Sequence, residues 1–415
     1  MSAVSLYDKL NLTFQKYYDR LFNFEGLFLL LAGIAVGIFA LDVGARHTFV
    51  FWSFLFGLGV IPFVVNRFRK FPINCKRIIT PKIGAGSTVT YAVMVENTGS
   101  QPIDGLHIRD EGLPWGIRPK LQWRLGEAVG FLEPGQKRRV LLQSDFVNRG
   151  VYDLPAIRAE YVDYFGLTRY GKTIEHNSHV VVYPRVYPVA SMDLSKLRVH
   201  QPGGIPLAAS VGESPEFRGL RKYRHGDPIR HISWKAFARL GYPIVREFQG
   251  EYFRRVAIVL DTHTNKKREA LEDFEAAVSL VASISQYFED NEYVIDLFAA
   301  GPEVYYLCTG RSLGHINDVL ELLACVQSST GASFPNVDEG LRRLIGRLSA
   351  LVVVTTDWRS DSKSFYQEIA GEVPELKVLC VRSSPTTLPM SEDVKSPRMM
   401  RTLTPAQVRE SVLEL

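Results

Sequence analysis

The side chains with the clearest capacity for chemistry crowd the segment from Glu213 to Phe248. Eight arginine and lysine residues stand there against four carboxylates, and large aromatic side chains are interleaved with them. Guanidinium groups pair with phosphates and carboxylates, and arginine together with aromatic residues is typical of protein interfaces. The segment therefore predicts either an anion site or a surface held together by ion pairs. Its most distinctive residues are Glu216, Phe217, Arg221, Tyr223, Gly226, Asp227, Arg230, Trp234 and Arg239.

Two further carboxylates suggest a second kind of site. Asp261 directly follows the apolar run 256–260, and Asp357 follows the run 351–354. Continuous apolar runs are typical of strands buried on both faces of a parallel sheet, and ligands bind beyond the carboxyl ends of such strands. Both carboxylates are therefore expected at one sheet edge. Mg²⁺ prefers oxygen ligands, and nearby hydroxyl groups are those of Thr262, Thr264, Thr355 and Thr356.

The segment that would hold these carboxylates, 251–415, alternates strand and helix patterns. Apolar residues from Leu271 to Phe288 recur at spacings of three and four, which predicts a helix with one apolar face. The other expected strands are 293–298, 351–354 and 378–381. The pattern predicts an α/β doubly wound domain, with a mainly parallel sheet covered by helices on both faces.

In the preceding segment, 71–185, apolar and polar residues alternate with a repeat of two residues. Residues 88–95 alternate and are rich in β-branched and aromatic side chains, and turn signals such as Glu133-Pro134-Gly135 separate further short strands. Several short strands with regular turns predict an immunoglobulin-like β-sandwich. No catalytic pattern lies in this segment, so we expect a structural module.

Residues 1–70 predict an amphipathic helix, lying on a membrane surface or packed on a folded domain, followed by two transmembrane helices. Segments 26–41 and 48–65 carry no charged residue, and their lengths approach what a bilayer requires. Basic residues flank the pair on its outer sides, which favours a cytoplasmic location for both ends. We therefore expect a multi-pass protein of the cell inner membrane, in contact with the bilayer through residues 26–65, with its other domains cytoplasmic. The alternatives are a pair of buried core helices, or a signal peptide for the first segment.

Composition narrows the classes of function. The hydrophobic fraction of 46% is ample for packed cores, and the net charge of +5 is mild. The four cysteines are scattered without a CxxC pair, which argues against a zinc site and a disulfide framework. Serine-hydrolase, zinc-protease and Walker-type phosphate-binding patterns do not occur. We therefore expect no enzyme, and no cofactor other than the Mg²⁺ considered above.

In the residues that follow its first expected strand, segment 251–415 resembles a von Willebrand factor A domain. The metal-ion-dependent adhesion site of that domain begins Asp-x-Ser-x-Ser, and here the motif reads Asp261-Thr262-His263-Thr264-Asn265. Asp357 matches the later aspartate of that site, and Thr330 is a candidate for its distant threonine. His263 and Asn265 replace the two serines, and histidine is a poor Mg²⁺ ligand. The resemblance leaves open whether Asp261 and Asp357 bind a metal or serve structure.

The basic segment resembles the signature of a bacterial membrane protein family named "domain of unknown function fifty-eight". The matching elements are Glu216-Phe217, Leu220-Arg221-Lys222-Tyr223, Gly226-Asp227, Arg230-His231-Ile232-Ser233-Trp234, Ala236-Phe237-Ala238-Arg239 and Val245-Arg246-Glu247-Phe248. The resemblance also covers the order of the domains, and one departure is the bulky Phe237 where a small residue is usual. It implies a MoxR-type AAA+ ATPase as partner, other membrane-associated proteins nearby, and a role in protein assembly or envelope-related remodelling.

Several uses of the linker and signature segment, 186–250, remain open. Its arginines could clamp it onto the von Willebrand factor A-like domain, its arginine and aromatic residues could form a partner surface, and its charge could attract nucleic acid or anionic lipid. The strip is short for nucleic acid, so no nucleic-acid partner is expected. We expect a membrane-anchored, non-enzymatic adaptor that binds protein partners. The alternative is a Mg²⁺-dependent adhesion-type switch.

Overall fold

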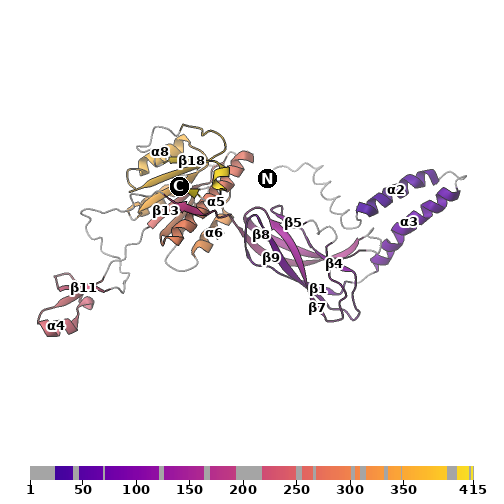
Figure 1. The fold of residues 1–415 in the computed structure, drawn as a ribbon, viewed down its shortest axis with the longest axis horizontal. Helices are drawn as coiled ribbons and strands as arrows, with labels where there is room; N and C mark the ends of the chain where they lie inside the picture. Colours follow the sequence, from indigo (N-terminus) through magenta and orange to yellow (C-terminus); the bar gives the residue numbers. More distant parts are fainter. Residues whose placement is uncertain are drawn as a thin grey trace. The chain divides into compact units, whose positions relative to one another are not determined.

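A computed structural model describes most of the chain. The described residues are 24–40, 46–68, 71–120, 126–162, 169–192, 217–248, 255–264, 268–300, 304–308, 315–330, 335–346, 348–389, 400–410 and 413–414. They form two compact units (Figure 1). The first lies within Met1–Arg185 and Leu323–Cys325, and the second within Val186–Leu322 and Val326–Leu415. Regular structure in these residues is mostly β-sheet, arranged in five sheets. The amphipathic helix expected near the start of the chain lies outside the described residues.

Two helices begin the described part of the first unit. They are α2 (Phe24–Ala40) and α3 (Arg46–Arg67), and they pack against each other. The helices approach closely at Gly37, where an added Cβ atom would lie 2.5 Å from Nε1 of Trp52. On α3 the rings of Trp52 and Phe56 stack with centroids 5.2 Å apart. A side chain larger than hydrogen at Gly37 would therefore require the ring of Trp52 to move.

These helices overturn the expected transmembrane hairpin. Among the described residues, no helix is both long enough and apolar enough to cross a membrane. α2 has 17 residues, which at about 1.5 Å per residue span about 26 Å, short of a hydrocarbon core of about 30 Å. A hairpin needs two spans. The prediction of two transmembrane helices within residues 26–65 is therefore wrong, and the inner-membrane location inferred from it falls with it.

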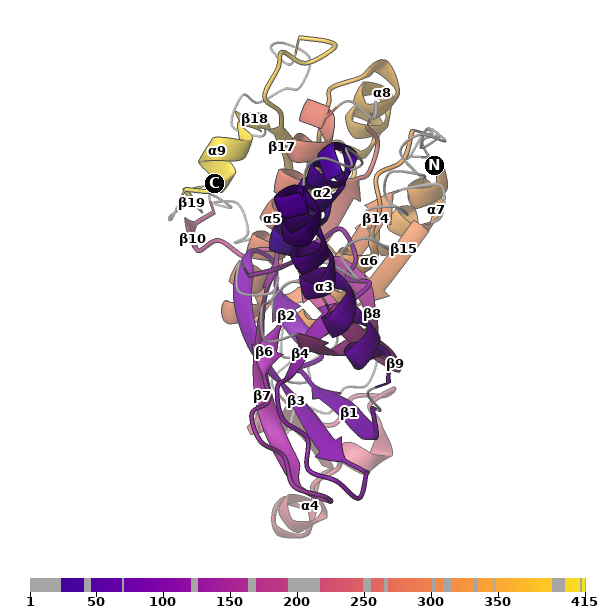
Figure 2. The same cartoon turned by 90° about the vertical axis from the view of Figure 1, so that its right-hand side faces the viewer.

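The rest of the first unit is a β-sandwich of two sheets. Its strands are β1 (Ile73–Ile78), β2 (Lys82–Gly84), β3 (Ser87–Asn97), β4 (Leu106–Glu111), β5 (Ile117–Pro119), β6 (Glu127–Ala128), β7 (Lys137–Phe146), β8 (Gly150–Val162) and β9 (Arg169–Tyr183). One sheet has the order β1-β3-β7-β5, with every pair antiparallel. Figure 2 shows β1, β3 and β7 side by side. The other has the order β2-β9-β8-β4-β6, with β2 and β9 parallel and the other pairs antiparallel. Side chains of both sheets meet in one cluster, where Val93 of β3 joins Ile108 of β4 and Ile157 of β8. They meet again in a second cluster, which includes Phe146 of β7 and Leu154 of β8.

A buried arginine ties the two sheets together. Arg77 of β1 is 4% exposed, and its guanidinium pairs with Asp110 of β4 in the opposite sheet. It also donates to the carbonyl oxygens of Leu154 and Ala156 in β8, each at 3.0 Å. Asp110 accepts a further hydrogen bond from the hydroxyl of Tyr91 in β3. Because both charges are buried and hydrogen-bonded, the pair sets how the sheets stack on each other.

The second unit is built on a six-stranded sheet. Its strands are β13 (Arg255–Asp261), β14 (Val294–Ala300), β15 (Val304–Cys308), β16 (Ala350–Thr355), β17 (Leu376–Val381) and β18 (Met400–Leu403). Their order is β15-β14-β13-β16-β17-β18, and every pair is parallel except β14 with β15. A separate parallel pair consists of β10 (Val189–Ser191) and β19 (Leu413–Glu414).

Helices cover both faces of this sheet. They are α5 (Arg268–Asp290), α6 (His315–Cys325), α7 (Pro335–Ile345), α8 (Ser360–Ile369) and α9 (Pro405–Val408). On one face, Val259 of β13 packs in a cluster with Leu341 of α7 and Tyr366 of α8. α5 packs against β13, β14, β16 and β17, and its buried side chains lie outside that cluster. It therefore covers the opposite face, to which alternate residues such as Ile258 turn.

A small hairpin precedes the six-stranded sheet in the chain. β11 (Phe217–Lys222) pairs antiparallel with β12 (Ile244–Phe248), with an irregular register between Phe217 and Gly219. Between the strands lie a short 3₁₀ helix, η2 (Ile229–His231), and α4 (Trp234–Leu240). Residues 219–246 are called the signature module below.

Replacing Arg77 with alanine should destabilise the sandwich strongly. The Asp110 carboxylate would stay buried without its cation, and removing one partner of a buried pair costs about 3–5 kcal/mol. Chemical denaturation of the full chain, followed by circular dichroism, measures the change in the free energy of unfolding.

Arg118→Ala is the matched control, because Arg118 is an exposed residue of β5. It should change the free energy of unfolding by less than about 0.5 kcal/mol. If Arg77→Ala lowers the free energy of unfolding no more than the control does, the pair of Arg77 and Asp110 does not stabilise the sandwich.

Candidate functional site

The carboxyl ends of β13 and β16 lie where the strand order of the six-stranded sheet reverses. From β13 the chain continues to β14 on one side, and it later returns to β16 and then β17 on the other side. Ligands in open parallel sheets bind beyond the carboxyl ends of the strands at such a reversal. Asp261 ends β13, and Asp357 follows β16. Both predicted carboxylates therefore lie at the expected edge.

Asp261 is compensated by groups of the protein itself. Its side chain is 1% exposed, and its Oδ1 accepts from the backbone N–H of His263 at 3.0 Å. Oδ2 accepts from the hydroxyl of Thr355 at 3.0 Å and lies 3.7 Å from Nη2 of Arg359. The single proton of Thr355 has a second acceptor in the carbonyl oxygen of Asp357, at 2.8 Å. The two carboxylate-bearing strand ends are thus linked through one threonine.

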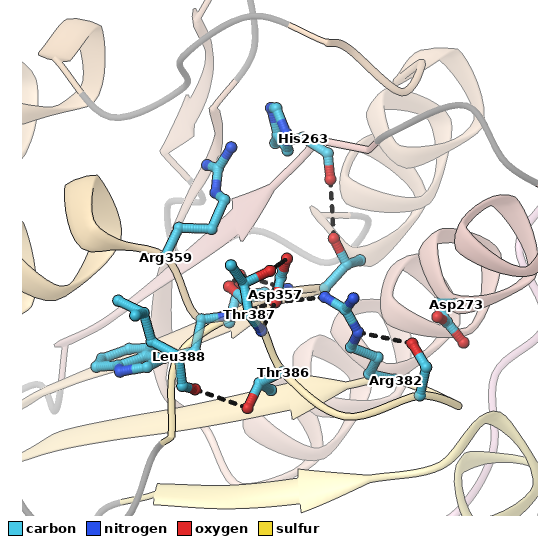
Figure 3. A network of polar contacts seen from close by, with 12 residues as sticks. His263, Asp273, Asp357, Arg359, Arg382, Thr386, Thr387 and Leu388 are labelled. Carbon is cyan, nitrogen blue, oxygen red and sulfur yellow. Dashed lines mark hydrogen bonds and ion pairs between the residues drawn. The ribbon is translucent and has the colours of Figure 1, made fainter.

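Asp357 is held by the segment that follows β17 (Figure 3). Its Oδ1 accepts from the backbone N–H groups of Trp358 and Thr387, each at 2.9 Å, and pairs with Arg382. Its Oδ2 accepts from the hydroxyl of Thr387 at 2.5 Å. Partial burial acts to raise the pKa of Asp357, but the hydrogen bonds from Thr387 and the nearby Arg382 outweigh it, so the pKa is lowered.

The same segment is anchored at two more points. Asp273 of α5 is 3% exposed and accepts from both the backbone N–H and the hydroxyl of Ser383, at 3.0 and 2.7 Å. The backbone N–H of Leu388 donates to the carbonyl oxygen of Trp358 at 3.0 Å. Residues 382–388, called the strap below, are therefore bonded across this edge of the sheet (Figure 3).

This geometry does not fit a Mg²⁺ site formed by Asp261 and Asp357. Mg²⁺ takes oxygen ligands in a near-octahedral array. Here the carboxylate lone pairs accept from N–H and O–H donors, and a guanidinium accompanies each carboxylate. In the described ranges, no group of three or more His, Cys, Asp or Glu side chains is placed to hold a metal. At this edge the arginines supply the positive charge that a cation would bring.

In the signature module, one ion pair closes the turn between β11 and η2. Nη1 and Nη2 of Arg221 donate to different oxygens of Asp227, each at 2.7 Å, and Oδ2 also accepts from the backbone N–H of Arg224 at 2.7 Å. The hydrogen bonds from Arg221 and Arg224 lower the pKa of Asp227 from 3.8 to about 2. Gly226 has a φ of 104°, a conformation that residues with a Cβ atom rarely adopt. Three of the predicted residues, Arg221, Gly226 and Asp227, therefore form this turn together.

The other predicted signature residues face solvent or support the hairpin. The backbone N–H of Tyr223 donates to the carbonyl oxygen of Pro243 at 3.0 Å, which extends the strand pairing. Arg230 and Arg239 are exposed. Trp234 is 61% exposed and meets Phe237 edge to face, with ring centroids 6.1 Å apart. Phe217 begins β11, and Glu216 lies outside the described residues.

Comparison with known proteins shows which family this region resembles. The family model described as "Protein of unknown function DUF58" matches residues 219–391. The "Uncharacterized protein YeaD" of Bacillus subtilis is 24% identical over 400 residues, which cover 93% of this chain and 95% of that protein. Over residues 219–391 this chain is similar to the DUF58 family. The DUF58 match begins at the first residue of the signature module and extends past the strap, so both sites lie within it.

Solved structures share little with this chain. A Salmonella alpha-2-macroglobulin mutant matches 27% of this chain with a TM-score of 0.21 and 14% identity, and the chain spans 7% of that protein. A PapD-like domain of human CEP192 matches 28% of this chain and 90% of its own, with a TM-score of 0.18 and 14% identity. A mutant PilB minor pilin from Streptococcus sanguinis matches 82% of this chain and 84% of its own, with a TM-score of 0.24 and 11% identity. Similarities this low carry no argument about function.

The DUF58 region also contains site residues that the sequence reasoning missed. They are Arg382 and Thr387, which bond to Asp357, and Arg359, whose Nη2 lies 3.7 Å from Oδ2 of Asp261. Arg382 directly follows β17, so the rule that pointed to Asp261 could have found it. Thr330, the predicted distant metal ligand, is exposed, and the neighbouring Ser329 instead forms a bridge with His263. The von Willebrand factor A resemblance and the ATPase partner stay predictions.

Asp357→Asn should destabilise the second unit in a pH-dependent way. The folded-state pKa of Asp357 is lowered, so its contribution is present above the ordinary pKa of an aspartate and is lost as the pH falls through the lower, folded value. At neutral pH the loss should be about 1–3 kcal/mol, because Arg382 would keep a partly buried charge without a counterion. Denaturation curves recorded from neutral pH to below the ordinary pKa of an aspartate measure this loss in the free energy of unfolding.

The difference between wild type and Asp357→Asn should therefore shrink toward acidic pH. Glu410→Gln, an exposed position, is the control and should leave the pH profile unchanged. A difference that stays constant across this range would show that Asp357 does not act through its charge.

Mg²⁺ and EDTA should leave the thermal unfolding midpoint unchanged in the wild type and in Asp261→Ala. The reason is that Asp261 and Asp357 already accept from protein donors. A cation bound at 100 times its Kd would add about 2.7 kcal/mol of stability, which calorimetry detects readily. A Mg²⁺-dependent rise in the wild type that disappears in Asp261→Ala would contradict this assignment.

Proposed function

We propose that this protein is a non-enzymatic scaffold that binds a partner protein through its signature module. The observation that carries the proposal is a group of large apolar side chains on α4 that face solvent. Trp234 is 61% exposed, Leu240 52% and Phe237 36%. Exposed apolar side chains rimmed by charge mark interaction sites. These three residues, which share one side of α4, are called the docking face.

The weak internal support of α4 favours this role. The helix has seven residues, and none of them is buried in the described part of the chain. Helices of this length are unstable alone in water, and the N-cap residue Ser233 makes no side-chain capping bond. What holds α4 is its junction with β12, where the backbone N–H of Ser233 donates to the carbonyl oxygen of Ile244 at 2.8 Å. Burial against a partner would stabilise the helix further.

The sheet edge favours a scaffold over an enzyme. A catalytic acid or base works best when its pKa lies near the operating pH and when it can reach the substrate. Asp261 is buried, and Asp357 has a lowered pKa and is covered by donors of the strap. Both carboxylates are better suited to holding the strap than to proton transfer.

As the partner we propose a MoxR-type AAA+ ATPase, with protein assembly or envelope-related remodelling as the setting. This part rests on the resemblance of the signature residues to those of the family. The exposed combination of tryptophan with arginine and lysine is compatible with it, because such residues dominate the energetics of protein interfaces.

Trp234→Ala should strongly reduce the capture of the partner without loss of folding. Full-length protein is crosslinked in a lysate of its own cells, and the crosslinked peptides are identified by mass spectrometry. The expected crosslinks join residues 219–246 to an AAA+ ATPase, and they should fall about tenfold or more in the variant because a central aromatic anchor is removed.

The matched control is Trp115→Ala, since Trp115 is 84% exposed but lies in the first unit. Its crosslinks should equal those of the wild type, and circular dichroism should show both variants folded. Crosslinks to the signature module that persist in Trp234→Ala would refute the docking face. Crosslinks that depend on Trp234 but lead to a different protein would refute only the identity of the partner.

A further inference from the structure

We infer that β15, an edge strand of the six-stranded sheet, pairs with the same strand of a second copy of this chain. The pairing is antiparallel and two-fold symmetric, and Tyr306 faces its counterpart across the axis. The sheets of the two copies then continue into each other. This inference does not depend on the docking face, because β15 lies outside residues 219–246.

The two edges of this sheet differ in how they are protected. β18 forms one edge and carries the exposed Arg401, and a charged side chain on an edge strand opposes pairing with another chain. β15 forms the other edge, and its sequence, Val-Tyr-Tyr-Leu-Cys, contains neither a charge nor a proline. Among the described residues, no strand pairs with its outer side. An uncharged, apolar edge strand is a ready template for a further strand.

The tyrosines of β15 are exposed on opposite faces of the sheet. Tyr305 is 42% exposed and Tyr306 48%, and successive residues of a strand point to opposite faces. The ring of Tyr306 stacks on Phe298 of β14 with centroids 4.7 Å apart, and its hydroxyl donates to the buried Asp296 at 3.1 Å. A side chain that is already held in place loses little conformational entropy on binding, so this edge is prepared for a partner.

Antiparallel pairing about the central residue uses the whole strand. Because β15 has five residues, a two-fold axis at Tyr306 brings all five into register with the second copy. Tyr306 then lies opposite Tyr306 of the second copy, and Tyr305 lies opposite Leu307. Directly opposite side chains have Cβ atoms about 4.5–5.5 Å apart, and aromatic pairs at this distance stabilise a sheet. On one face, the stacked pair of Phe298 and Tyr306 continues into the same pair of the second copy.

Charge favours a second copy over a different protein. In a two-fold symmetric interface the same surface lies on both sides, so a charge near the axis would meet a like charge. β15 contains no charge, and the Asp296 carboxylate that bonds to Tyr306 is already paired with Arg255. Interfaces between different proteins use complementary charges to select the partner. β15 offers no charge for such selection, whereas its aromatic and apolar side chains complement themselves.

Dityrosine crosslinking of the full-length wild type tests this pairing without any substitution. Photo-oxidation with persulfate removes one hydrogen atom from each of two neighbouring tyrosine rings and joins them, and mass spectrometry identifies the joined residues. We expect a covalent dimer in which Tyr306 is joined to Tyr306, a link that only two copies can form. Tyr305→Phe should retain this link because Tyr305 faces Leu307, and Tyr306→Phe should abolish it.

Opposite charges at position 306 provide a second test. Sedimentation of the wild type should show a dimer whose fraction rises with protein concentration. Tyr306→Lys and Tyr306→Glu should each be monomeric, since like charges then lie opposite each other, and an equal mixture of the two should recover the dimer. Circular dichroism verifies that both are folded. Thr402→Lys, an exposed position of β18, is the control and should dimerise like the wild type.

Three results would overturn the inference. They are a monomeric wild type without the Tyr306 link, a dimer that persists in each charged variant alone, and, in a lysate of its own cells, links that join Tyr306 to a different protein. If the charged variants do not fold, the crosslink of the wild type decides. The proposed function fails separately, because Trp234→Ala should leave the dimer unchanged.

Discussion

An aspartate held by an arginine fixes the geometry of each folded part of this chain. Such pairs meet through directional hydrogen bonds, so they set how segments distant in sequence lie against each other. Their net contribution to stability is smaller than their attraction suggests, because both charges lose hydration. The three pairs are Arg77 with Asp110 in the sandwich, Arg221 with Asp227 in the signature module and Arg382 with Asp357 at the sheet edge.

The three pairs have different consequences because their surroundings differ. Arg77 and Asp110 are buried between two sheets and leave nothing exposed for a ligand. Arg382 and Asp357 join the strap to the edge where parallel sheets usually bind ligands, and they thereby occupy it. Arg221 and Asp227 close a surface turn. Asp227 is the one carboxylate within residues 219–246, which also contain seven basic residues.

Local pattern predicted the buried elements of the second unit well. The apolar run 256–260 lies in β13, and the periodic segment 271–288 lies in α5. In both, the side chains that face the core dominate the pattern. β15 was missed because it is a short edge strand with exposed tyrosines. The hydropathy pattern led to the wrong prediction of a transmembrane hairpin. An uncharged run shows that a segment is apolar, but it does not show how long its helix is. α2 has 17 residues.

The sequence by itself determined which residues could act: the signature motif, the surplus of positive charge, and two aspartates after apolar strands. These depend on composition and short-range spacing, which a linear pattern records. Only the tertiary structure decided their partners. Arg382 and Thr387 reach Asp357 from the strap, which follows it by more than twenty residues. Whether a charged residue is free or neutralised depends on such long-range contacts, and so the candidate metal edge became a closed network while α4 remained exposed.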